Sequence, residues 1–550
     1  MALSKEAYRE FEDIVGPRYI SADPVLLDSY SYLLSHTSLH MGPAYDVYTP
    51  RGEAVLLPAS TEEVQAIVRL CNKYKMQLKA SSTFWGAMGY PSDKNCIQLD
   101  MRRMDHILEI DEKNMFAVVE PHVIGASLQA EAMKRGLNAH IHGPGASCSC
   151  LASATSYGGM GPDGIFLGVG DEIMLGVEWV MPNGEILRTG SLGSGLGWFY
   201  GEGPGPSARA IVRGAYGCKG AFGVFTKCAL KLSPWPGPTA IPVEGTVPAY
   251  RARLPENFKA YTLCFPTWQS FADTAYKIWD AGIGYVAHRQ FNMFGRDLKL
   301  AMLKILNSPS GTLNHIEKLL KDPAINKATE DMKRDFQLVL VGQTPRDMAW
   351  QEKALDTILS QTGGWKSAVM SEPDMHDWAL LYLLKLGHKN LNLSYAGGYD
   401  GCFGLAGPPD YGVQFVEEAS DLKLEWEKKG QIVAGGGDCT MGGIATIGGG
   451  ATVVWENFTC FDPYDKESTD GTWDFFEATS AHGVKRGWGS GMERTNAVAR
   501  GLDGKNTPRE VREKMMAASK QPSTFRYQRK IREAFDPNVL GDAYYQTLDY

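Results

Sequence analysis

Long apolar runs and an excess of basic residues are both missing from this sequence of 550 residues. No apolar run approaches the roughly 18 residues that a membrane-spanning helix needs, and the charged start, MALSKEAYREFEDIVG, is unlike a signal sequence. A formal net charge of -8 argues against a protein that binds nucleic-acid phosphates. We therefore expect a cytoplasmic protein with no transmembrane segment and no nucleic-acid partner.

Cysteine motifs for metals, haem or disulfides are missing too. The chain has 10 cysteines, and the one close pair, Cys148 and Cys150, has C-x-C spacing with no second pair nearby. No C-x-x-C-H motif occurs, so a haem or iron–sulfur centre would have to lie on another chain. We expect reduced thiols and no metal site.

Two common nucleotide motifs are also absent. No GxGxxG follows the first predicted strand and no GxxxxGK[ST] occurs, so neither a Rossmann dinucleotide site nor a P-loop is indicated. The composition is that of a globular protein, with 44% hydrophobic and 21% charged residues. The length allows two or three structural units with large cores, as in a substantial enzyme.

Two successive α/β blocks are predicted near the start of the chain. The helix of the first block, residues 60–74, has a clear start signal, because Ser60 and Glu63 form a capping box before apolar residues at helical spacing. The second block predicts a strand at 116–121 and a helix at 126–136 that ends on glycine. The strands expected in the first block are residues 54–58, 76–80, 96–101 and 107–111.

The middle of the chain is rich in glycine. Residues 143–223 have this composition, apart from a hairpin predicted within 178–190 around Asn183-Gly184. The run Pro234–Pro242 indicates a boundary, after which helices alternate with short strands. The second glycine-rich run, 435–450, is expected either to line a substrate pocket or to form a surface loop.

Six segments together resemble one known family, block by block and in order. They are VVEPHVIGASLQAEAMKRG (118–136), HGPGASCSCLASATSYGG (142–159), GVGDEIMLGVEWVMPNGEILRTG (168–190), YGCKGAFGVFTKCALKLSPWPG (216–237), GWGSGMERTN (487–496) and KIREAFDPNVLGD (530–542). The family they resemble is the vanillyl-alcohol oxidase and p-cresol methylhydroxylase (PCMH-type) family of FAD-binding oxidoreductases.

This resemblance implies an α+β fold. A two-lobed PCMH-type FAD-binding domain would carry a cap, or substrate, domain that has an antiparallel sheet and flanking helices. The expected divisions are residues 1–237 for the FAD-binding domain, 238–480 for the cap domain, and 481–550 for a C-terminal segment that returns to the FAD domain.

FAD is the cofactor that the resemblance implies. Its pyrophosphate would lie in the loop 81–86, where serine and threonine hydroxyls replace some of the family's glycine amides; a plain connection between strand and helix is the alternative. Residues 147–159 would form the second cradle, and 220–226 would cover the adenine side. The residues expected to contact FAD are Ser81, Ser82, Thr83, Phe84, Trp85, Gly86, Pro121, Gly145, Ser147, Cys148, Leu151, Ala152, Ser153, Ser156, Tyr157, Gly158, Gly220, Gly223, Val224 and Arg494.

Attachment of FAD is expected to be non-covalent. The histidine that carries flavin in some relatives would fall within residues 446–454, where no histidine occurs. A thioether link through Cys148 or Cys150 is the alternative, against the more common outcome of an apolar, packed cysteine.

Four residues are expected to act in catalysis. Arg494 resembles the family's arginine that stabilises the reduced flavin, and Asp171 resembles the aspartate close to flavin N5, with the adjacent Glu172 as the alternative. His288 and Arg289, on a predicted strand VAHRQFNMF, would bind or deprotonate the substrate. His142 is a further candidate for that role. Each of these three residues has a purely structural alternative, Arg494 could instead be a surface helix arginine, and Asp171 or Glu172 could instead cap the neighbouring turn.

Simple phenol oxidation is disfavoured. The family's phenol oxidases hold the phenolate with two tyrosines, and the matching places here are Trp85 and either Met492 or Glu493. A phenolate without those hydroxyls would lose charge-assisted hydrogen bonds worth roughly 1.5 to 3 kcal/mol each.

The function implied is that of an FAD-dependent dehydrogenase or oxidase. It would take a hydride from a carbon that bears or adjoins oxygen, in an alcohol, aryl alcohol or hydroxy acid, and pass the electrons to a separate acceptor that the sequence does not identify. Three alternatives stay open: a D-lactate-type 2-hydroxyacid dehydrogenase, a non-redox transferase similar to alkyl-dihydroxyacetonephosphate synthase, and a flavin-binding subunit beside an electron-accepting protein. A homo-oligomer is expected.

Overall fold

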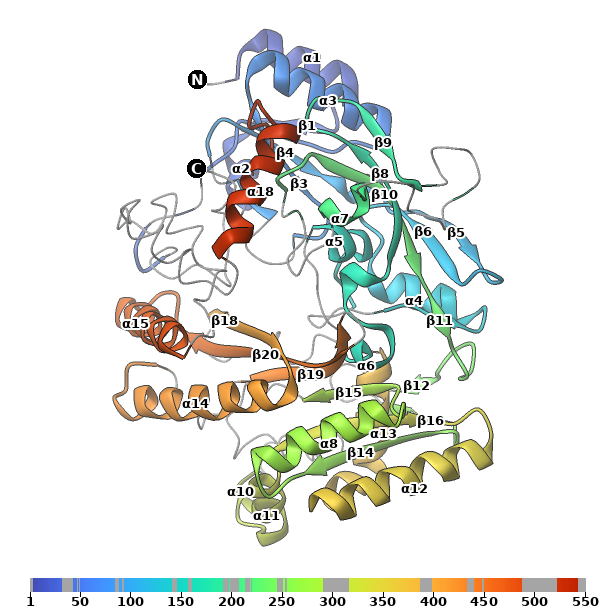
Figure 1. The fold of residues 1–550 in the computed structure, drawn as a ribbon. Coiled ribbons are helices and arrows are strands. Elements are labelled where there is room, and N and C mark those ends of the chain that lie inside the picture. Colours follow the sequence, from blue (N-terminus) through green and yellow to red (C-terminus); the bar gives the residue numbers. More distant parts are fainter. Residues whose placement is uncertain are drawn as a thin grey trace.

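The structure is a computed structural model of the chain (Figure 1). It describes residues 3–31, 43–46, 48, 50–84, 89–91, 93–140, 146–156, 161–190, 197, 207–212, 218, 220–244, 251–252, 255–289, 316–385, 398–432, 440–447, 450–486 and 522–542. Among these residues, no helix is long and apolar enough to cross a membrane.

The first lobe is a four-stranded sheet with helices packed on it. Its strand order is β1-β2-β4-β3, and β2 and β3 run parallel to the central β4. Helix α3 (Thr61–Tyr74) begins after Ser60, whose side chain accepts a hydrogen bond from the Glu63 amide, and the predicted helix is thereby confirmed. The other elements are α1 (Lys5–Val15), β1 (Ile20–Ser21), α2 (Pro24–Ser29), β2 (Ala54–Leu56), β3 (Gln77–Ser81), β4 (Cys96–Asp100) and η2 (Met101–Arg103).

The second lobe is an antiparallel sheet of five strands in the order β5-β6-β10-β8-β9. The predicted hairpin is confirmed, because β8 pairs with β9 across the turn at Asn183. The helix predicted at 126–136 is also present, but it begins one residue earlier, at Gly125, and ends at Met133. The elements are β5 (Ile107–Asp111), β6 (Phe116–Val119), α4 (Gly125–Met133), β7 (Leu137–Asn138), α5 (Cys150–Thr155), α6 (Gly164–Leu167), η3 (Gly170–Glu172), β8 (Met174–Val180), β9 (Ile186–Arg188), α7 (Ala208–Val212), β10 (Val224–Lys231) and β11 (Ser233–Pro234).

A third sheet forms the cap below the two lobes in Figure 1. It is antiparallel, with seven strands in the order β17-β14-β16-β15-β19-β20-β18. Its elements are β14 (Phe258–Cys264), α8 (Trp268–Asp280), β15 (Val286–Arg289), α10 (Ile316–Leu320), α11 (Pro323–Asp331), β16 (Asp335–Val341), α12 (Pro345–Thr362), β17 (Trp365–Lys366), η6 (Val369–Ser371), α13 (Pro373–Lys385), β18 (Gly398–Gly407), α14 (Pro409–Lys428), β19 (Thr440–Ile447), β20 (Gly450–Phe461) and α15 (Lys466–Lys485), preceded by the small pair β12 (Val243–Glu244) and β13 (Arg251–Ala252).

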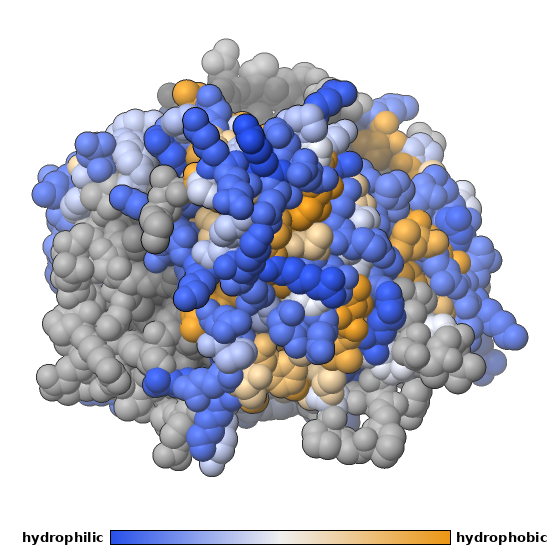
Figure 2. Space-filling model, turned by 90° about the horizontal axis from the view of Figure 1, so that it is seen from above, coloured by the Kyte–Doolittle hydropathy of each residue, from blue (hydrophilic) through white to orange (hydrophobic). Residues whose placement is uncertain are grey.

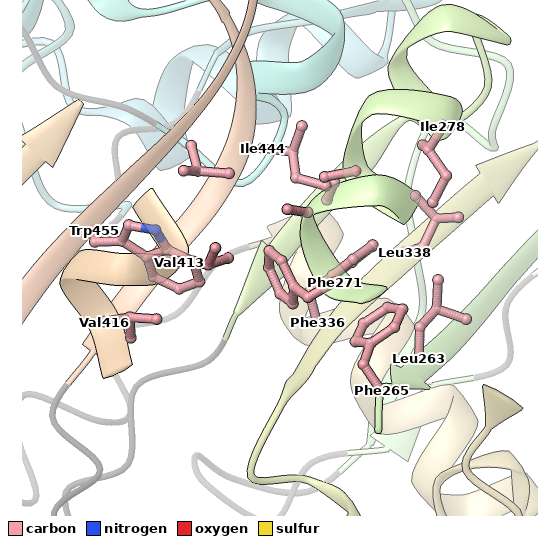
Figure 3. Close-up of a cluster of buried hydrophobic side chains, with 14 of the residues drawn as sticks. Leu263, Phe265, Phe271, Ile278, Phe336, Leu338, Val413, Val416, Ile444 and Trp455 are labelled. Carbon is pink, nitrogen blue, oxygen red and sulfur yellow. The ribbon is translucent and has the colours of Figure 1, made fainter. Parts of the chain in front are cut away.

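Two hydrophobic cores cover opposite faces of the cap sheet. On one face, α8, α12 and α14 pack around Phe271, Phe336 and Trp455 (Figure 3). On the other face, α11 and α13 pack on strand residues such as Val286 and Val339, together with Met133 and Trp235 of the second lobe. This second core therefore joins the cap to the lobes.

The C-terminal part of the described chain packs on the lobes. Helix α18 (Pro522–Phe535) stacks Phe535 on the buried Trp179 at 5.9 Å between ring centroids. The segment after it adds to β3, because the Leu78 amide donates to the Leu540 carbonyl at 2.7 Å and the Asp542 amide donates to the Leu78 carbonyl at 2.9 Å. Figure 2 views the molecule from above, the side on which α1 lies in Figure 1, and shows hydrophilic side chains around hydrophobic groups.

The predicted α+β class, with two lobes and an antiparallel cap sheet, is confirmed. The strand expected at VAHRQFNMF begins as β15, and its second half lies outside the described residues. The exact domain limits at 237 and 480 stay predictions.

Candidate functional site

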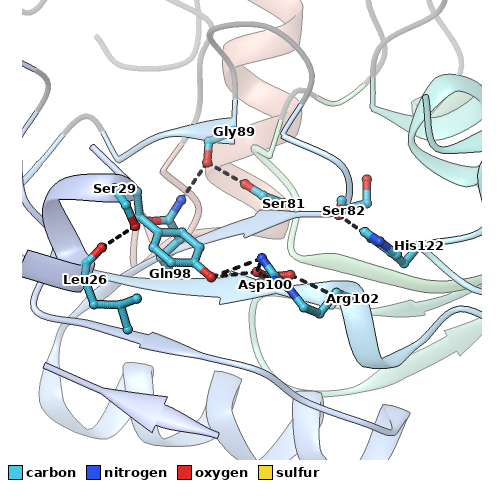
Figure 4. A network of polar contacts seen from close by, with 10 residues as sticks. Leu26, Ser29, Ser81, Ser82, Gly89, Gln98, Asp100, Arg102 and His122 are labelled. Atoms are coloured by element: carbon cyan, nitrogen blue, oxygen red, sulfur yellow. Dashed lines mark hydrogen bonds and ion pairs between the residues drawn. The ribbon is translucent and has the colours of Figure 1, made fainter. Parts of the chain in front are cut away.

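The loop that follows β3 lies where the two lobes meet. Ser81 ends β3, and its hydroxyl donates to the Gly89 carbonyl at 2.5 Å. The Gln98 side chain donates to the same carbonyl at 2.8 Å, so the far end of the loop is tied back to β4 (Figure 4). The loop is therefore anchored to its own sheet at both ends.

Two segments of the second lobe contact this loop. His122 Nδ1 lies 2.6 Å from the Ser82 carbonyl oxygen, and the Ser149 amide donates to the Thr83 hydroxyl at 3.3 Å. The Ser149 hydroxyl donates to the Pro121 carbonyl at 2.5 Å, which ties the two second-lobe segments to each other. Three pieces of chain predicted to contact FAD are thus brought together: 81–84, 121 and 147–152.

Small side chains dominate the second-lobe part of this site. Ser149 caps α5, and the cradle continues through Ala152 and Ser153. The Cys218 amide donates to the Thr155 carbonyl at 3.0 Å, which places the end of α5 beside the stretch before β10. A nucleotide needs close approach of backbone to ligand, and small side chains permit it.

Glycine is required at Gly223 for a packing reason. Its φ is +92°, and a Cβ there would lie 2.3 Å from the Val180 carbonyl oxygen. This packing reason does not depend on a cofactor, and the contact of Gly220 and Gly223 with FAD stays a prediction.

A charged and aromatic cluster packs against the loop 81–84 through Phe84. Asp100 accepts hydrogen bonds from the Tyr30 hydroxyl at 2.7 Å and from Arg102 Nε at 2.7 Å. Burial and the bond to Asp100 raise the pKa of Tyr30 to about 12, so the hydroxyl stays a donor near neutral pH. The Tyr30 ring packs edge-on against Phe84 at 5.3 Å between centroids.

The predicted catalytic residues of the cap point to opposite faces of β15, since side chains alternate along a strand. Arg289 lies on the face of α8, where its guanidinium lies over Trp268. Its Nε is 3.4 Å from Oδ1 of Asp335, the first residue of β16. His288 lies on the other face, the face whose core includes residues of the second lobe. The structure therefore separates two residues that the sequence placed in one role.

The structure describes only some of the other residues that were predicted to form the site. Asp171 is in η3, and its side chain is outside the described residues. The remaining predicted FAD contacts Leu151, Ser156 and Val224 lie in or next to α5 and in β10. Nine residues with a predicted role lie outside the described residues: Trp85, Gly86, His142, Gly145, Tyr157, Gly158, Met492, Glu493 and Arg494.

Sequence reasoning missed three polar features near the site. His122 lies in the segment 118–136 that carries part of the family resemblance, but its residue type alone indicates no role. His140 Nδ1 lies 2.6 Å from Asp163 Oδ1, and its Nε2 accepts the Gly161 amide at 3.2 Å, with both side chains buried. Lys79 and Asp542 form a buried ion pair at 3.7 Å. Of these three features, only His122 could have been found from the sequence, because it is a histidine in the turn between a predicted strand and a predicted helix.

Cys148 and Cys150 are expected to be unreactive in the folded protein. Burial, together with Cys150, raises the pKa of the Cys148 thiol, and burial raises that of Cys150 to about 12. Since the thiolate is the reactive form, alkylation should be slow from pH 6 to 9 and complete only after unfolding in urea. Peptide mass spectrometry after iodoacetamide treatment measures this, and a flavin adduct on the peptide holding these cysteines would contradict it.

Comparison with known proteins agrees with this arrangement. Residues 52–190 match the family described as FAD binding domain. Curated relatives include glycolate oxidase subunit GlcD of Bacillus subtilis, 27% identical over 34% of this chain and 38% of that protein, and a probable mitochondrial D-lactate dehydrogenase of Danio rerio, 26% identical over 42% and 41%. The chain thus spans about two fifths of the length of these relatives.

Solved structures match over almost the whole chain. The 4-ethylphenol oxidase from Gulosibacter chungangensis has a TM-score of 0.70 at 18% identity, covering 99% of this chain and 98% of that one. A p-cresol methylhydroxylase with substrate bound has a TM-score of 0.72 at 15% identity, covering 99% and 96%. The chain therefore carries an FAD-binding domain and has the fold of the PCMH-type flavoproteins.

Proposed function

We propose that the protein is an FAD-dependent oxidoreductase that removes a hydride from a carbon bearing or adjoining oxygen, in an alcohol, aryl alcohol or hydroxy acid. The observation that carries the proposal is the meeting of the loop 81–84 with residues 121 and 147–152 between the two lobes. Its support from other proteins is the matched FAD-binding domain and the dehydrogenases and oxidases among the relatives.

The described residues fit FAD. The loop 81–84 offers hydroxyls and backbone groups, and the segment from Ser147 to Ser153 offers mostly small side chains next to it. FAD, when bound, supplies the hydride-accepting ring. The protein's part is to hold the pyrophosphate with Ser82 and Thr83 and to let the rest of the cofactor lie along α5. We propose non-covalent attachment, since the thiols of Cys148 and Cys150 are buried and protonated.

The proposed substrate side of the site is the cap face that carries His288. We propose His288 as a substrate-binding or proton-accepting group, and Asp171 and Arg494 as groups beside the flavin. Arg289 has its charge balanced by Asp335 and its guanidinium over Trp268, and we assign it to the cap structure. His288 is 97% buried, so a substrate there would be shielded from water.

A 2-hydroxyacid dehydrogenase is the second candidate. Its support is that the curated relatives include glycolate oxidase and D-lactate dehydrogenase sequences. A transferase like alkyl-dihydroxyacetonephosphate synthase, whose structure matches with a TM-score of 0.60 at 14% identity, would need no net electron transfer. Substrate-dependent flavin reduction separates the first two from the third. We further propose a cytoplasmic homo-oligomer that passes electrons to a separate acceptor.

The visible spectrum tests this proposal. The purified protein is expected to be yellow, to release its flavin into the supernatant on acid precipitation, and to bleach under anaerobic conditions with one member of a panel of alcohols and chiral hydroxy acids. Bleaching by a D-2-hydroxy acid alone would select the second candidate. A colourless protein that takes up no added FAD would overturn the flavoenzyme proposal altogether.

A further inference from the structure

Two hydrogen bonds cross from the second lobe to the loop 81–84. The first joins His122 Nδ1 to the Ser82 carbonyl at 2.6 Å (Figure 4). The second joins the Ser149 amide to the Thr83 hydroxyl at 3.3 Å. His122 is itself held in place, because its amide donates to the Met104 carbonyl at 2.8 Å. We call these two cross-lobe bonds the clamp.

The His122 bond fixes both a tautomer and a peptide direction. A carbonyl oxygen only accepts, so His122 Nδ1 must carry the proton. Because the trans peptide is planar, its C=O and N–H point in opposite directions. Turning the Ser82 carbonyl toward His122 therefore turns the Thr83 amide away from it, which sets the direction of one donor in the loop.

The next residue holds the loop in a disfavoured backbone conformation. Phe84 has a φ of +53°, in the left-handed region that residues with a Cβ seldom adopt. Its ring packs edge-on against Tyr30 at 5.3 Å and Tyr90 at 6.2 Å between centroids. A strained backbone conformation persists only where surrounding contacts hold it in place. Here those contacts are the aromatic packing of Phe84 and the clamp on the two residues before it.

We propose that the clamp shapes the FAD loop before the cofactor binds, and that His122 is a positioning residue for FAD affinity. The inference rests on the proposed placement of the FAD pyrophosphate in this loop. A loop already ordered in the apoprotein loses less conformational freedom on binding, so a broken clamp lowers affinity without removing any ligand contact.

The test compares FAD dissociation constants of apoproteins, measured by quenching of flavin fluorescence. His122→Ala removes the donor and should weaken binding about tenfold, the equivalent of one lost hydrogen bond. His122→Asn keeps an N–H donor near the Nδ1 position and should bind within about twofold of wild type. His106→Ala is the matched control, because His106 is an exposed histidine bonded to Glu120 in the same region.

A double variant and a second readout separate positioning from general stability. Thr83→Val breaks the other clamp bond and also removes the hydroxyl that we propose contacts the pyrophosphate, so its own effect is not a measure of the clamp. Combined with His122→Ala, it should weaken binding by less than the product of the two single effects, because both bonds hold one loop. An apoprotein melting temperature that falls while the dissociation constant stays unchanged would overturn the clamp, as would His122→Asn binding as weakly as His122→Ala. Failure of wild type to bind FAD would overturn the proposed function as well, whereas equal affinity of wild type and His122→Ala would overturn the clamp alone.

Discussion

Replacing Asp542 by asparagine is expected to lower the free energy of unfolding of the flavin lobes by about 3–5 kcal/mol. Asp542 lies after α18 and is fully buried, 3.7 Å from the equally buried ammonium group of Lys79 in β3. Removing one charge of a buried pair leaves the other without its counter-charge in a low-dielectric interior, which costs more than the pair itself contributes.

The position of this pair explains why the effect should extend beyond one contact. Asp542 belongs to the segment that pairs with Leu78, and Gly220 of the second lobe covers it so closely that a Cβ there would lie 3.3 Å from the Asp542 carbonyl oxygen. The first lobe, the second lobe and the chain's C-terminal segment all meet here. Loss of the pair should therefore weaken the packing of the two lobes against each other, in addition to destabilising β3.

Urea unfolding of the apoprotein measures this prediction. Lys79→Met combined with Asp542→Asn should recover most of the loss, because no lone charge then stays buried. The exposed pair Arg51–Asp28 is the control, and Arg51→Met should change stability by less than about 1 kcal/mol. Wild-type stability of the single Asp542 variant would show that the pair contributes nothing.

Replacing Arg289 by methionine is expected to destabilise the cap by a similar amount, about 3–5 kcal/mol. Arg289 is 2% exposed and Asp335 is fully buried, and the two side chains lie 3.4 Å apart where β15 ends and β16 begins. The variant leaves the Asp335 carboxylate buried in the cap without its cation. Arg289→Met with Asp335→Asn should restore stability, which a double-mutant cycle in urea measures.

The same variant decides between two roles for Arg289. If it supports the cap, its loss lowers the unfolding midpoint and leaves the flavin spectrum unchanged. If it binds substrate, as the sequence suggested, its loss raises the KM and leaves the midpoint unchanged. His288→Gln, on the opposite face of the same strand, is the companion variant and should change substrate binding more than stability.

Local features of the fold were readable from the sequence. Helix α3 followed from Ser60, Glu63 and apolar residues at helical spacing, and the β8–β9 hairpin followed from Asn183-Gly184, because capping and turn chemistry act over a few residues. The ordered glycine-rich blocks likewise indicated the FAD-binding domain that residues 52–190 match. The alternation of side chains along the predicted strand VAHRQFNMF likewise places His288 and Arg289 on opposite faces.

The sequence by itself thus determined the fold class and the FAD-binding domain, since the blocks of residues that indicate them are each short and continuous in the chain. Only the tertiary structure decided which distant groups meet: Lys79 with Asp542, His122 with Ser82, and Arg289 with Asp335. Those pairs carry no sequence pattern, because a buried charge or a turn histidine finds its partner only when the sheets pack. Burial then makes each pairing matter, since a polar group removed from water must be satisfied inside the protein.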